Sequence, residues 1–466
     1  MADQDFTPKP IENLCPVCLK RIHAHKVAEG NEILMVKHCQ DHGTFEAVAW
    51  RGEPPMGSWQ RPKVPVHPTI CYSDVDLGCP FDCGICEQHE QLPCSALLEV
   101  TQRCNLRCPV CFADSGSESV ADPNLETIAF WFNRVKEAAG ACNIQLSGGE
   151  PTLRDDLPAI IEIGRKTGFS FIQLNTNGLH LSSCKDYVRT LKDAGLVSVF
   201  LQFDGVDDGI YQSLRGRPLL AEKLQAIERC DEGGLGVVLV PTLVPGVNTR
   251  AIGSIVKLAL KLGPVVRGVH FQPMSYFGRY PAEPERGGRI TLPEVMKALE
   301  EQTEGMIKKN QFSPPGCEHA LCSFHGTFIR TADGGLKSIT ENTDRSCCSQ
   351  ATSAGVSKTV ALVSQRWTAP AIQNDFPMTQ NRSCCNPRLE LSSAGPVDLD
   401  TFLEQVRSNS FTISCMAFQD VWTLDLERLR GCCIFVVARD GCLVPFCAYN
   451  LTSTTGQRLY RNEEKD

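Results

Sequence analysis

Apolar, β-rich runs alternate with segments of helical period from Ala96 to about residue 280. Near-continuous apolar runs of this length are typical of parallel strands covered by helices on one face and by a packed interior on the other. The six predicted strands are Ala96–Arg103, Asn143–Thr152, Ser170–Gly178, Val197–Gly205, Gly236–Gly246 and Val266–Met274. The predicted helices are Leu125–Gly140, Leu157–Gly168, Cys184–Gly195, Leu219–Gly234 and Thr249–Gly263. Six β-α units in series predict an α/β fold with a barrel or an open sheet of parallel strands.

The flanking regions have different patterns. A Pro-rich linker, RPKVPVHP, follows the first 60 residues, and beyond Pro314 the periodicity fades into a segment predicted to be rich in loops. Near the C-terminus, RLRGCCIFVVARDGCLVPFCAYN predicts two strands joined by a turn at RDG. We therefore divide the chain into a metal-binding module (1–60), a cysteine segment (61–95), a partial barrel (96–312) and a cysteine-rich α+β region (313–466).

The composition of the chain argues against several classes of protein. The chain has 46 basic and 54 acidic residues and a net charge of −8, which argues against a nucleic-acid-binding protein. No apolar run is long enough to span a bilayer, and the polar, acidic N-terminus does not resemble a signal peptide, so we expect a cytosolic protein. The chain contains 25 cysteines. In a cytosolic protein of this size, clustered cysteines indicate metal binding rather than disulfides.

Three of these cysteines, Cys104, Cys108 and Cys111, lie on one loop directly after the first predicted strand, with the spacing C-x3-C-x2-C. In barrels of parallel strands, this end of the strands holds the active site. Three thiolates can bind three irons of a [4Fe-4S] cube and leave the fourth iron open to a small molecule, and an open coordination position is a catalytic feature. A zinc knuckle that borrows a fourth ligand is the structural alternative.

The turn GGEPT (Gly148–Thr152) follows the second predicted strand. Its two glycines let the backbone approach a ligand closely, and Pro151 stiffens the turn. Glu150 could hold an ammonium group. Taken alone, the turn is equally consistent with an ordinary strand-helix connection.

Together, the three-cysteine loop and the GGEPT turn resemble the radical S-adenosylmethionine (SAM) superfamily over roughly residues 96–280. The resemblance implies a partial (β/α)6 barrel and a [4Fe-4S] cluster whose fourth iron is chelated by SAM. It also implies one-electron cleavage of SAM to a 5′-deoxyadenosyl radical that abstracts hydrogen from an unactivated C–H bond, with ferredoxin or flavodoxin as reductant. The residues that it assigns to SAM are Gly148, Gly149, Glu150, Pro151, Asn175, Asp204 and Arg215.

A second C-x3-C-x2-C motif precedes the barrel, with a further cysteine eight residues later. These four predicted ligands of an auxiliary [4Fe-4S] cluster are Cys79, Cys83, Cys86 and Cys94. Cys71 competes with Cys94 for the fourth position, and zinc is an alternative to iron. Because four protein ligands would close the cluster, we expect it to transfer electrons or to position substrate.

The N-terminal module contains the pattern C-x2-C-x20-C-x2-H, formed by Cys15, Cys18, Cys39 and His42. Two such pairs can close a tetrahedral site, as in zinc-ribbon or rubredoxin-like modules. Thiolates suit both metals, so the pattern leaves one mononuclear zinc or iron open. His38, next to Cys39, is predicted to be a surface residue.

The C-terminal cysteines suggest a second auxiliary cluster, which would bring the total to three [4Fe-4S] clusters rather than two. Its candidate ligands are Cys317, Cys322, Cys433 and Cys447. Neighbouring cysteines on a strand face opposite sides, so Cys432 and Cys433 are not expected to serve one cluster, and the same objection applies to the pairs Cys347/Cys348 and Cys384/Cys385. Cys142, Cys184 and Cys230 fall in or beside helices and are predicted core residues.

The N-terminal module, the GCPFDCGIC block and the C-terminal hairpin together resemble the radical SAM group that includes archaeal tetraether lipid synthase and bacterial relatives, some of them selenoproteins. This resemblance implies carbon-carbon bond formation on an alkyl chain, a lipid substrate and, for the bacterial relatives, a partner methyltransferase. Phe271, Met274, Tyr276 and Phe277 would line an apolar tunnel or belong to the core. The alternatives are radical SAM modification of a peptide or a cofactor by methylation or maturation, and a non-catalytic iron-sulfur electron carrier.

Overall fold

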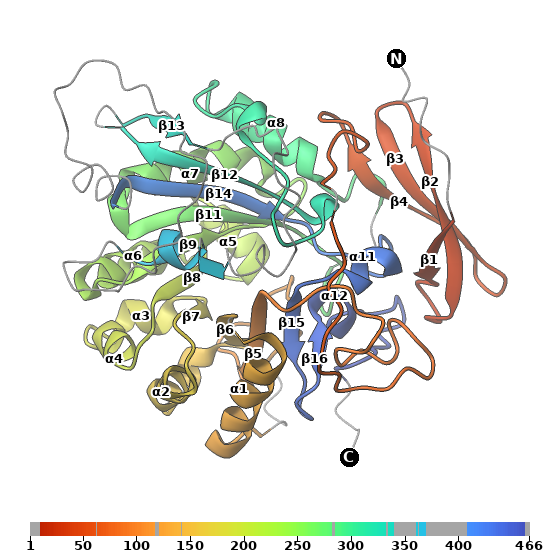
Figure 1. Ribbon diagram of the computed structural model, residues 1–466. Helices are drawn as coiled ribbons and strands as arrows, with labels where there is room; N and C mark the ends of the chain where they lie inside the picture. Colours follow the sequence, from red (N-terminus) through yellow and green to blue (C-terminus); the bar gives the residue numbers. More distant parts are fainter. Residues whose placement is uncertain are drawn as a thin grey trace, which may run out of the picture.

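Figure 1 shows the computed structural model, which describes residues 10–61, 63–116, 121–140, 142–281, 285–331, 334–339, 360–361, 363–369 and 408–461. The cysteine pairs Cys347/Cys348 and Cys384/Cys385 lie outside these residues. Within the segment predicted to be rich in loops, the described residues 360–361 and 363–367 are helical.

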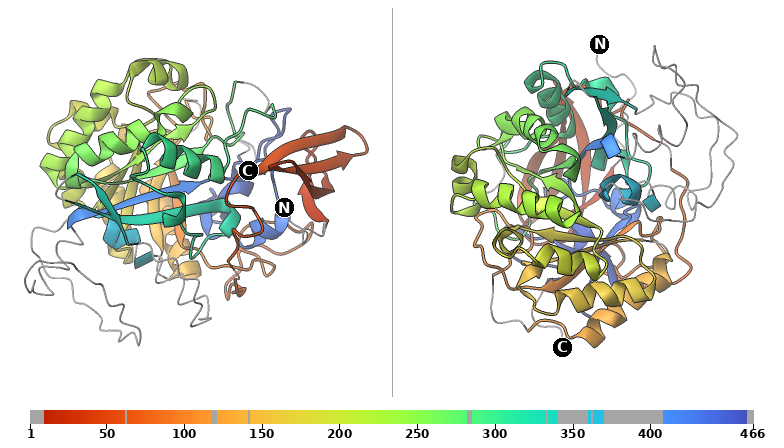
Figure 2. Two further views of the ribbon diagram at one scale, coloured as in Figure 1. Left: turned by 90° about the horizontal axis from the view of Figure 1, so that it is seen from above. Right: turned by 90° about the vertical axis from the view of Figure 1, so that its left-hand side faces the viewer.

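Six parallel strands form the centre of a large sheet, in the order β5-β6-β7-β8-β9-β11. These strands are β5 (Ser95–Thr101), β6 (Asn143–Gly148), β7 (Ile172–Thr176), β8 (Ser198–Gln202), β9 (Gly236–Val240) and β11 (Val266–Pro273), and the short β10 (Thr242–Leu243) pairs with β11. The helices along them are α1 (Leu125–Ala139), α2 (Leu157–Thr167), α3 (Leu179–Ser183), α4 (Tyr187–Asp193), α5 (Asp208–Arg215), α6 (Leu220–Gly233) and α7 (Ile252–Lys261). Helices cover the outer face of the sheet (Figure 2), so the predicted partial (β/α)6 barrel is confirmed.

Strands from the C-terminal region extend the sheet at both edges. At one edge, β14 (Ser410–Met416) pairs in parallel with β11 and is followed by the antiparallel strands β12 (Ser323–Arg330) and β13 (Leu336–Ser338). At the other edge, β15 (Ile434–Val437) pairs in parallel with β5 and forms a hairpin with β16 (Leu443–Pro445). The predicted hairpin is thus confirmed, and Figure 1 shows the late, blue strands on both sides of the barrel. Helix α8 (Leu292–Gln302) precedes the C-terminal region, and helices α11 (Leu426–Arg430) and α12 (Phe446–Tyr449) lie within it.

The two faces of the barrel strands differ in chemistry. Leu146, Leu174 and Val199 are fully buried in the core formed with the helices. The alternate positions Gln145 and Gln173 carry amides on the inner face, where a barrel interior is usually filled by branched apolar side chains. The inner face is therefore built to receive a polar ligand rather than only to pack.

The N-terminal module is a four-stranded antiparallel sheet that stands to one side of the barrel (Figure 2). Its strands are β1 (Ile11–Leu14), β2 (Arg21–Glu29), β3 (Glu32–Cys39) and β4 (Gly43–Arg51). The buried ammonium of Lys37 donates to Asn13 Oδ1 at 2.8 Å and also to the Val421 carbonyl, and burial lowers the Lys37 pKa to about 7. Arg51 pairs with Glu294 of α8 at 3.0 Å. These contacts fix the module to the C-terminal region and to α8.

The chain end is held against the first barrel strand by an ion pair between Arg461 and Glu99, both of which are almost fully buried. Removing one partner leaves the other charged and buried, which typically costs about 3–5 kcal/mol. We expect Arg461→Met to lower the free energy of unfolding, measured in urea, by about 3–5 kcal/mol. The double variant Arg461→Met/Glu99→Gln should recover much of this loss. Lys166→Met, which removes an exposed ion pair with Glu162, serves as control. Equal urea midpoints of unfolding for Arg461→Met and Lys166→Met would contradict a stabilising role of the buried ion pair.

Candidate active site and metal centres

The cysteine loop and the GGEPT turn are joined backbone to backbone. The amide of Gly149 donates to the Thr101 carbonyl at 2.8 Å, and the amide of Glu150 donates to the Arg103 carbonyl at 2.8 Å. A Cβ on Gly148 would lie 2.1 Å from the Thr101 oxygen, and one on Gly149 would lie 2.1 Å from the Arg103 oxygen. No side chain fits at these positions, so the two glycines are needed first for contact with the cysteine loop.

Glu150 is buried and its carboxylate is fully used inside the protein. Oε1 accepts hydrogen bonds from the Thr152 amide, the Thr152 hydroxyl and the Thr176 hydroxyl, and Oε2 accepts one from the Asn177 amide at 2.7 Å. Asn177 in turn donates to Asn105 Oδ1 at 2.7 Å. The carboxylate therefore ties the turns after β6 and β7 to the cysteine loop.

Arg215 and Asp204 form a buried bidentate ion pair, with both N–O distances at 2.7 Å. Arg215 also donates to the Val110 carbonyl in the cysteine loop at 3.1 Å. Burial opposes the charge of Arg215, but the carboxylate of Asp204 outweighs this effect and the Arg215 pKa is raised. Arg215 thus places a permanent positive charge beside Cys108, and the ion pair with Asp204 fixes the position of the guanidinium.

A cavity of about 300 Å³ occupies the barrel interior next to the cysteine loop. All three loop cysteines line it, as do Gly148, Gly149, Glu150, Asn175 and Arg215 of the residues expected to bind SAM. Pro151 and Asp204 are buried but do not line it. Of the four residues considered for an apolar tunnel, Met274 and Phe277 line the cavity, whereas Phe271 and Tyr276 are buried in hydrophobic clusters.

The comparisons with known proteins agree with this geometry. A family model described as the radical SAM superfamily matches residues 98–259, and one described as the HMPTM N-terminal zinc ribbon domain matches residues 7–51. The 7,8-dihydro-6-hydroxymethylpterin dimethyltransferase of Methanocaldococcus jannaschii is 34% identical over 94% of this chain and 92% of its own length. The chain belongs to the radical SAM superfamily.

More distant relatives match about half of the chain. A probable GTP 3′,8-cyclase of Methanococcus maripaludis is 29% identical over 52% of this chain and 82% of its own length. Among solved structures, SuiB of Streptococcus suis superposes with a TM-score of 0.38 at 15% identity over 46% of each chain. As a member of the radical SAM superfamily, this protein is an enzyme that uses SAM, a [4Fe-4S] cluster and an electron donor. No helix among the described residues is long and apolar enough to cross a membrane.

The residues of the loop fit the cluster. Burial raises the Cys104 pKa to about 11 and raises the Cys108 pKa, which the charge of Arg215 counteracts in part. The free thiols of Cys104 and Cys108 are therefore protonated at neutral pH, so that binding of iron must displace their protons. A cluster with thiolate ligands carries negative charge, and the guanidinium of Arg215 is placed to compensate for it.

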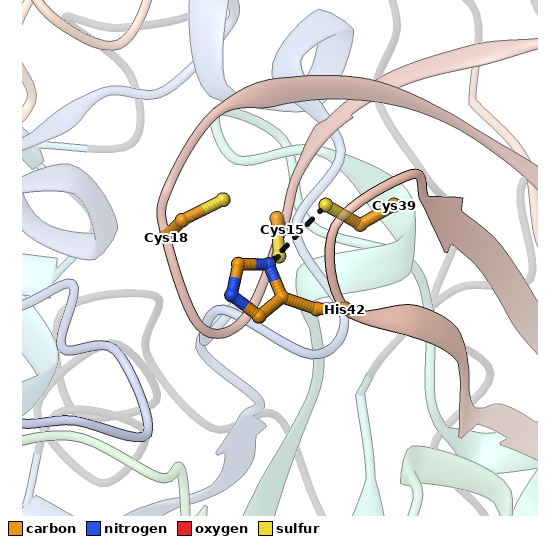
Figure 3. Close-up of side chains that lie close together, drawn as sticks. All are labelled: Cys15, Cys18, Cys39 and His42. Atoms are coloured by element: carbon orange, nitrogen blue, oxygen red, sulfur yellow. Dashed lines mark hydrogen bonds between the residues drawn. The ribbon is translucent and has the colours of Figure 1, made fainter.

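The four predicted ligands of the N-terminal module come together (Figure 3). Each of Cys15, Cys18, Cys39 and His42 can place one ligand atom within 4.8 Å of the others. His42 Nδ1 lies 3.5 Å from Cys39 Sγ and 3.7 Å from Cys15 Sγ. A closed set of three thiols and one imidazole is typical of a structural zinc site.

The remaining cysteines group differently from the sequence-based sets. Cys94 lies with Cys317 and Cys433, all three buried with their sulfurs within 4.8 Å, and Cys94 Sγ is 3.0 Å from Cys433 Sγ. Cys79, Cys83 and Cys86 line a separate small cavity. Cys322, Cys432 and Cys447 line a third, which Cys433 also borders. Cys71 is exposed. The regrouping arises because β15 pairs with β5, which brings residue 433 next to residue 94.

Several cavity residues were missed by the sequence analysis. They are Asn143, Gln145, Gln173, Gln202, His270, Gln272 and Trp367. Gln145 and Gln173 had a detectable signal, because each places an amide inside an otherwise apolar strand at a position that alternation directs inward. Trp367 had none, since its segment has no clear period.

The contact of Gly149 with Arg103 allows a sharp test. Gly149→Ala should displace the cysteine loop, so we expect anaerobically reconstituted variant protein to lose iron at this site and to form at least about a hundredfold less 5′-deoxyadenosine, as expected for clashes of several kcal/mol. Gly287→Ala is the control, since a Cβ there meets nothing within 4 Å. Wild-type rates for Gly149→Ala would refute the steric account.

The new cysteine grouping can be tested by metal analysis. We expect Cys94→Ala, Cys317→Ala and Cys433→Ala each to lose the same increment of iron and sulfide, because all three sulfurs would serve one centre. Cys71→Ala, at an exposed position, should lose none. Iron loss in Cys71→Ala, with full retention in Cys433→Ala, would contradict the grouping of Cys94, Cys317 and Cys433.

Proposed function

We propose that this protein methylates a reduced pterin, in a radical SAM reaction carried out in the barrel cavity. The whole-chain similarity to a pterin dimethyltransferase supports this proposal, because it covers the N-terminal module, the barrel and the C-terminal strands alike. It favours cofactor modification, the alternative in the sequence analysis, over carbon-carbon coupling on a lipid chain.

The observation that carries the proposal is the polar interior of the barrel. Gln145, Gln173 and Asn175 line the cavity on two adjacent strands, where a lipid-binding site would present apolar side chains. An alkyl chain placed there would remove these amides from water and offer them no hydrogen bond, at a cost of about 1–3 kcal/mol for each unpaired group. A pterin offers both donors and acceptors at its ring edge.

Different residues of the chain would hold the cluster and SAM and keep water out of the cavity. Cys104, Cys108 and Cys111 would hold the cluster, and the turn Gly148–Glu150 with Arg215 would hold SAM at the cavity wall. When bound, the cluster and SAM would supply a carbon-centred radical that removes hydrogen from a C–H bond of the pterin. The SAM that is cleaved leaves as methionine, so the methyl group that replaces this hydrogen would come from a second SAM or another one-carbon donor, and the reductant would supply the electrons. The buried aromatic side chains at the cavity rim, Phe277 and Phe446, would exclude water from the carbon-centred radical.

The other centres have supporting roles under this proposal. We assign zinc to the N-terminal module, and one or two auxiliary iron-sulfur clusters to the cysteine groups around Cys94 and Cys83. Cys94 lines the barrel cavity and also belongs to the group with Cys317 and Cys433. A cluster bound by this group would therefore lie close enough to the substrate to exchange an electron with it. Ferredoxin or flavodoxin would deliver the electron for SAM cleavage, and no separate methyltransferase partner is required.

The test is an anaerobic reaction of the reconstituted protein with 7,8-dihydro-6-hydroxymethylpterin, SAM and a chemical reductant. A second series adds heat-treated, filtered cell extract as a source of other one-carbon donors. We expect binding of the pterin, pterin-dependent formation of 5′-deoxyadenosine, and a pterin product heavier by one or two methylene units. The Cys108→Ala variant should still bind the pterin but form no product.

A glycerol ether lipid serves as the competing substrate. If the lipid stimulated 5′-deoxyadenosine formation and changed in mass while the pterin neither bound nor reacted, the proposal would be wrong and the resemblance to lipid synthases would guide the substrate search.

A further inference from the structure

Among the described residues, two carboxylates line the barrel cavity, those of Glu150 and Glu318. Glu150 uses both of its oxygens inside the protein, in four hydrogen bonds. Glu318 is only partly buried, and neither of its carboxylate oxygens is a fully buried atom without a partner. No other described side chain pairs with it. Glu318 therefore offers the cavity a carboxyl group that no other side chain engages.

Glu318 lies at the end of the cavity that is remote from the cysteine loop. It directly follows Cys317, whose sulfur lies with those of Cys94 and Cys433. Cys94 immediately precedes β5, whereas the cysteine loop follows the other end of this strand, and both line the cavity. Seven residues of extended strand span about 20 Å, so the two groups of cysteines mark opposite ends of the cavity.

The strands give this end of the cavity a mixed lining. Ser95 and Asn143, the first residues of β5 and β6, lie opposite each other in the parallel pairing, and both line the cavity. Phe171, directly before β7, lines it as well. Polar groups and an aromatic ring thus come from the strands, while Glu318 supplies a carboxyl group from the C-terminal region.

Glu318 lies beside two cysteine groups. The Cys94 group consists of three thiols whose sulfurs lie within 4.8 Å of one another, and the carboxylate of Glu318 is not among these ligand atoms. Glu318 also lines the neighbouring small cavity, which Cys322, Cys432 and Cys447 border. Metal analysis therefore has to accompany a binding test at this residue.

A carboxyl group on a cavity wall favours a ligand with two adjacent polar atoms on one edge. Its two oxygens lie in one plane and can form two parallel hydrogen bonds, which orient a planar ligand as well as bind it. An alkyl chain would leave the group without a partner, at a cost of about 1–3 kcal/mol. The position of Glu318 thus favours a heterocycle over a hydrocarbon.

We propose that Glu318 is a specificity-determining residue, which binds the amino edge of a 2-amino nitrogen heterocycle. The inference rests on the proposed function and deepens it. For a pterin, an ionised carboxylate accepts hydrogen bonds from the 2-amino group and the adjacent ring N–H. A protonated carboxyl group accepts from the 2-amino group and donates to the ring nitrogen on its other side. Because the amino edge is held at Glu318, the opposite edge of the ring faces the cysteine loop and the GGEPT turn, where the hydrogen is removed.

The experiment compares two ligands that differ in the amino group alone. Calorimetry on the reconstituted, SAM-bound holoprotein would measure binding of 7,8-dihydro-6-hydroxymethylpterin and of its 2-deamino analogue, which has hydrogen in place of the 2-amino group. We expect wild type to prefer the pterin by about tenfold or more, because the analogue leaves one oxygen of Glu318 unpaired.

Substitutions at Glu318 should change this preference selectively. Glu318→Met, of similar size, and Glu318→Ala should bind the pterin about tenfold more weakly and should bind both ligands about equally. Glu318→Gln should keep most of the preference, because its amide oxygen still accepts from the 2-amino group. Glu301→Met is the matched control, since it makes the same change at an exposed position on α8.

Iron content and SAM binding at wild-type levels would show that a variant is folded and loaded. If wild type binds neither ligand, the proposed function itself fails. If wild type binds the pterin, and Glu318→Met and Glu318→Ala keep the full affinity and preference, the assignment of Glu318 is overturned while the proposed function stands. Loss of iron from the Glu318 variants, of the size found for Cys317→Ala, would also overturn it, because the carboxylate would then be a metal ligand.

Discussion

The close backbone contact between the cysteine loop and the turn after β6 is the constraint on which the active site depends. Two successive glycines bring the Gly149 and Glu150 amides onto the Thr101 and Arg103 carbonyls, at positions where any Cβ would overlap an oxygen. Glu150 then uses its whole carboxylate to bind the next turn. The cysteine loop, the GGEPT turn and the end of β7 are thus joined into one unit before any cofactor binds, and such prior positioning favours precise radical chemistry.

The C-terminal region completes what the six-stranded barrel leaves open. An open sheet has two edges with unpaired backbone groups, and β14 and β15 cover one each. This covering also has chemical consequences, because it brings Cys433 to Cys94 and places Phe446 at the cavity. The buried contact of Arg461 with Glu99 holds the chain end against the first strand, next to the cysteine loop. The C-terminal region therefore belongs to the catalytic unit in structure as well as in sequence similarity.

Local signals made most of the fold and the cysteine loop predictable. Strand and helix periods and the pairs Cys15/Cys18 and Cys39/His42 each depend on residues close in sequence, and the structure agrees with them. The three-cysteine loop lies directly after β5, as expected, and all three cysteines line the cavity. The auxiliary ligands were not predictable in the same way, because Cys94 meets Cys433 only through the pairing of β5 with β15, 339 residues further along the chain, and Cys317 comes from a third segment. Asp204 shows a further limit: its sequence position matched a ligand-binding turn, but only the fold reveals that Arg215 consumes its carboxylate.

The inward side chains of the barrel strands can either pack as an apolar core or present polar groups to a ligand. The outward residues of β6 and β7, Leu146 and Leu174, are as apolar as any core requires. The inward glutamines of the same strands hydrogen-bond to each other, to Asn175 and to Ser198, and Gln145 is only half-buried. Polar groups retained in a barrel interior favour a ligand that can hydrogen-bond with them, and this is the basis of the proposed substrate class. A lipid tail cannot supply those hydrogen bonds, whereas a heterocycle with donors along one edge can.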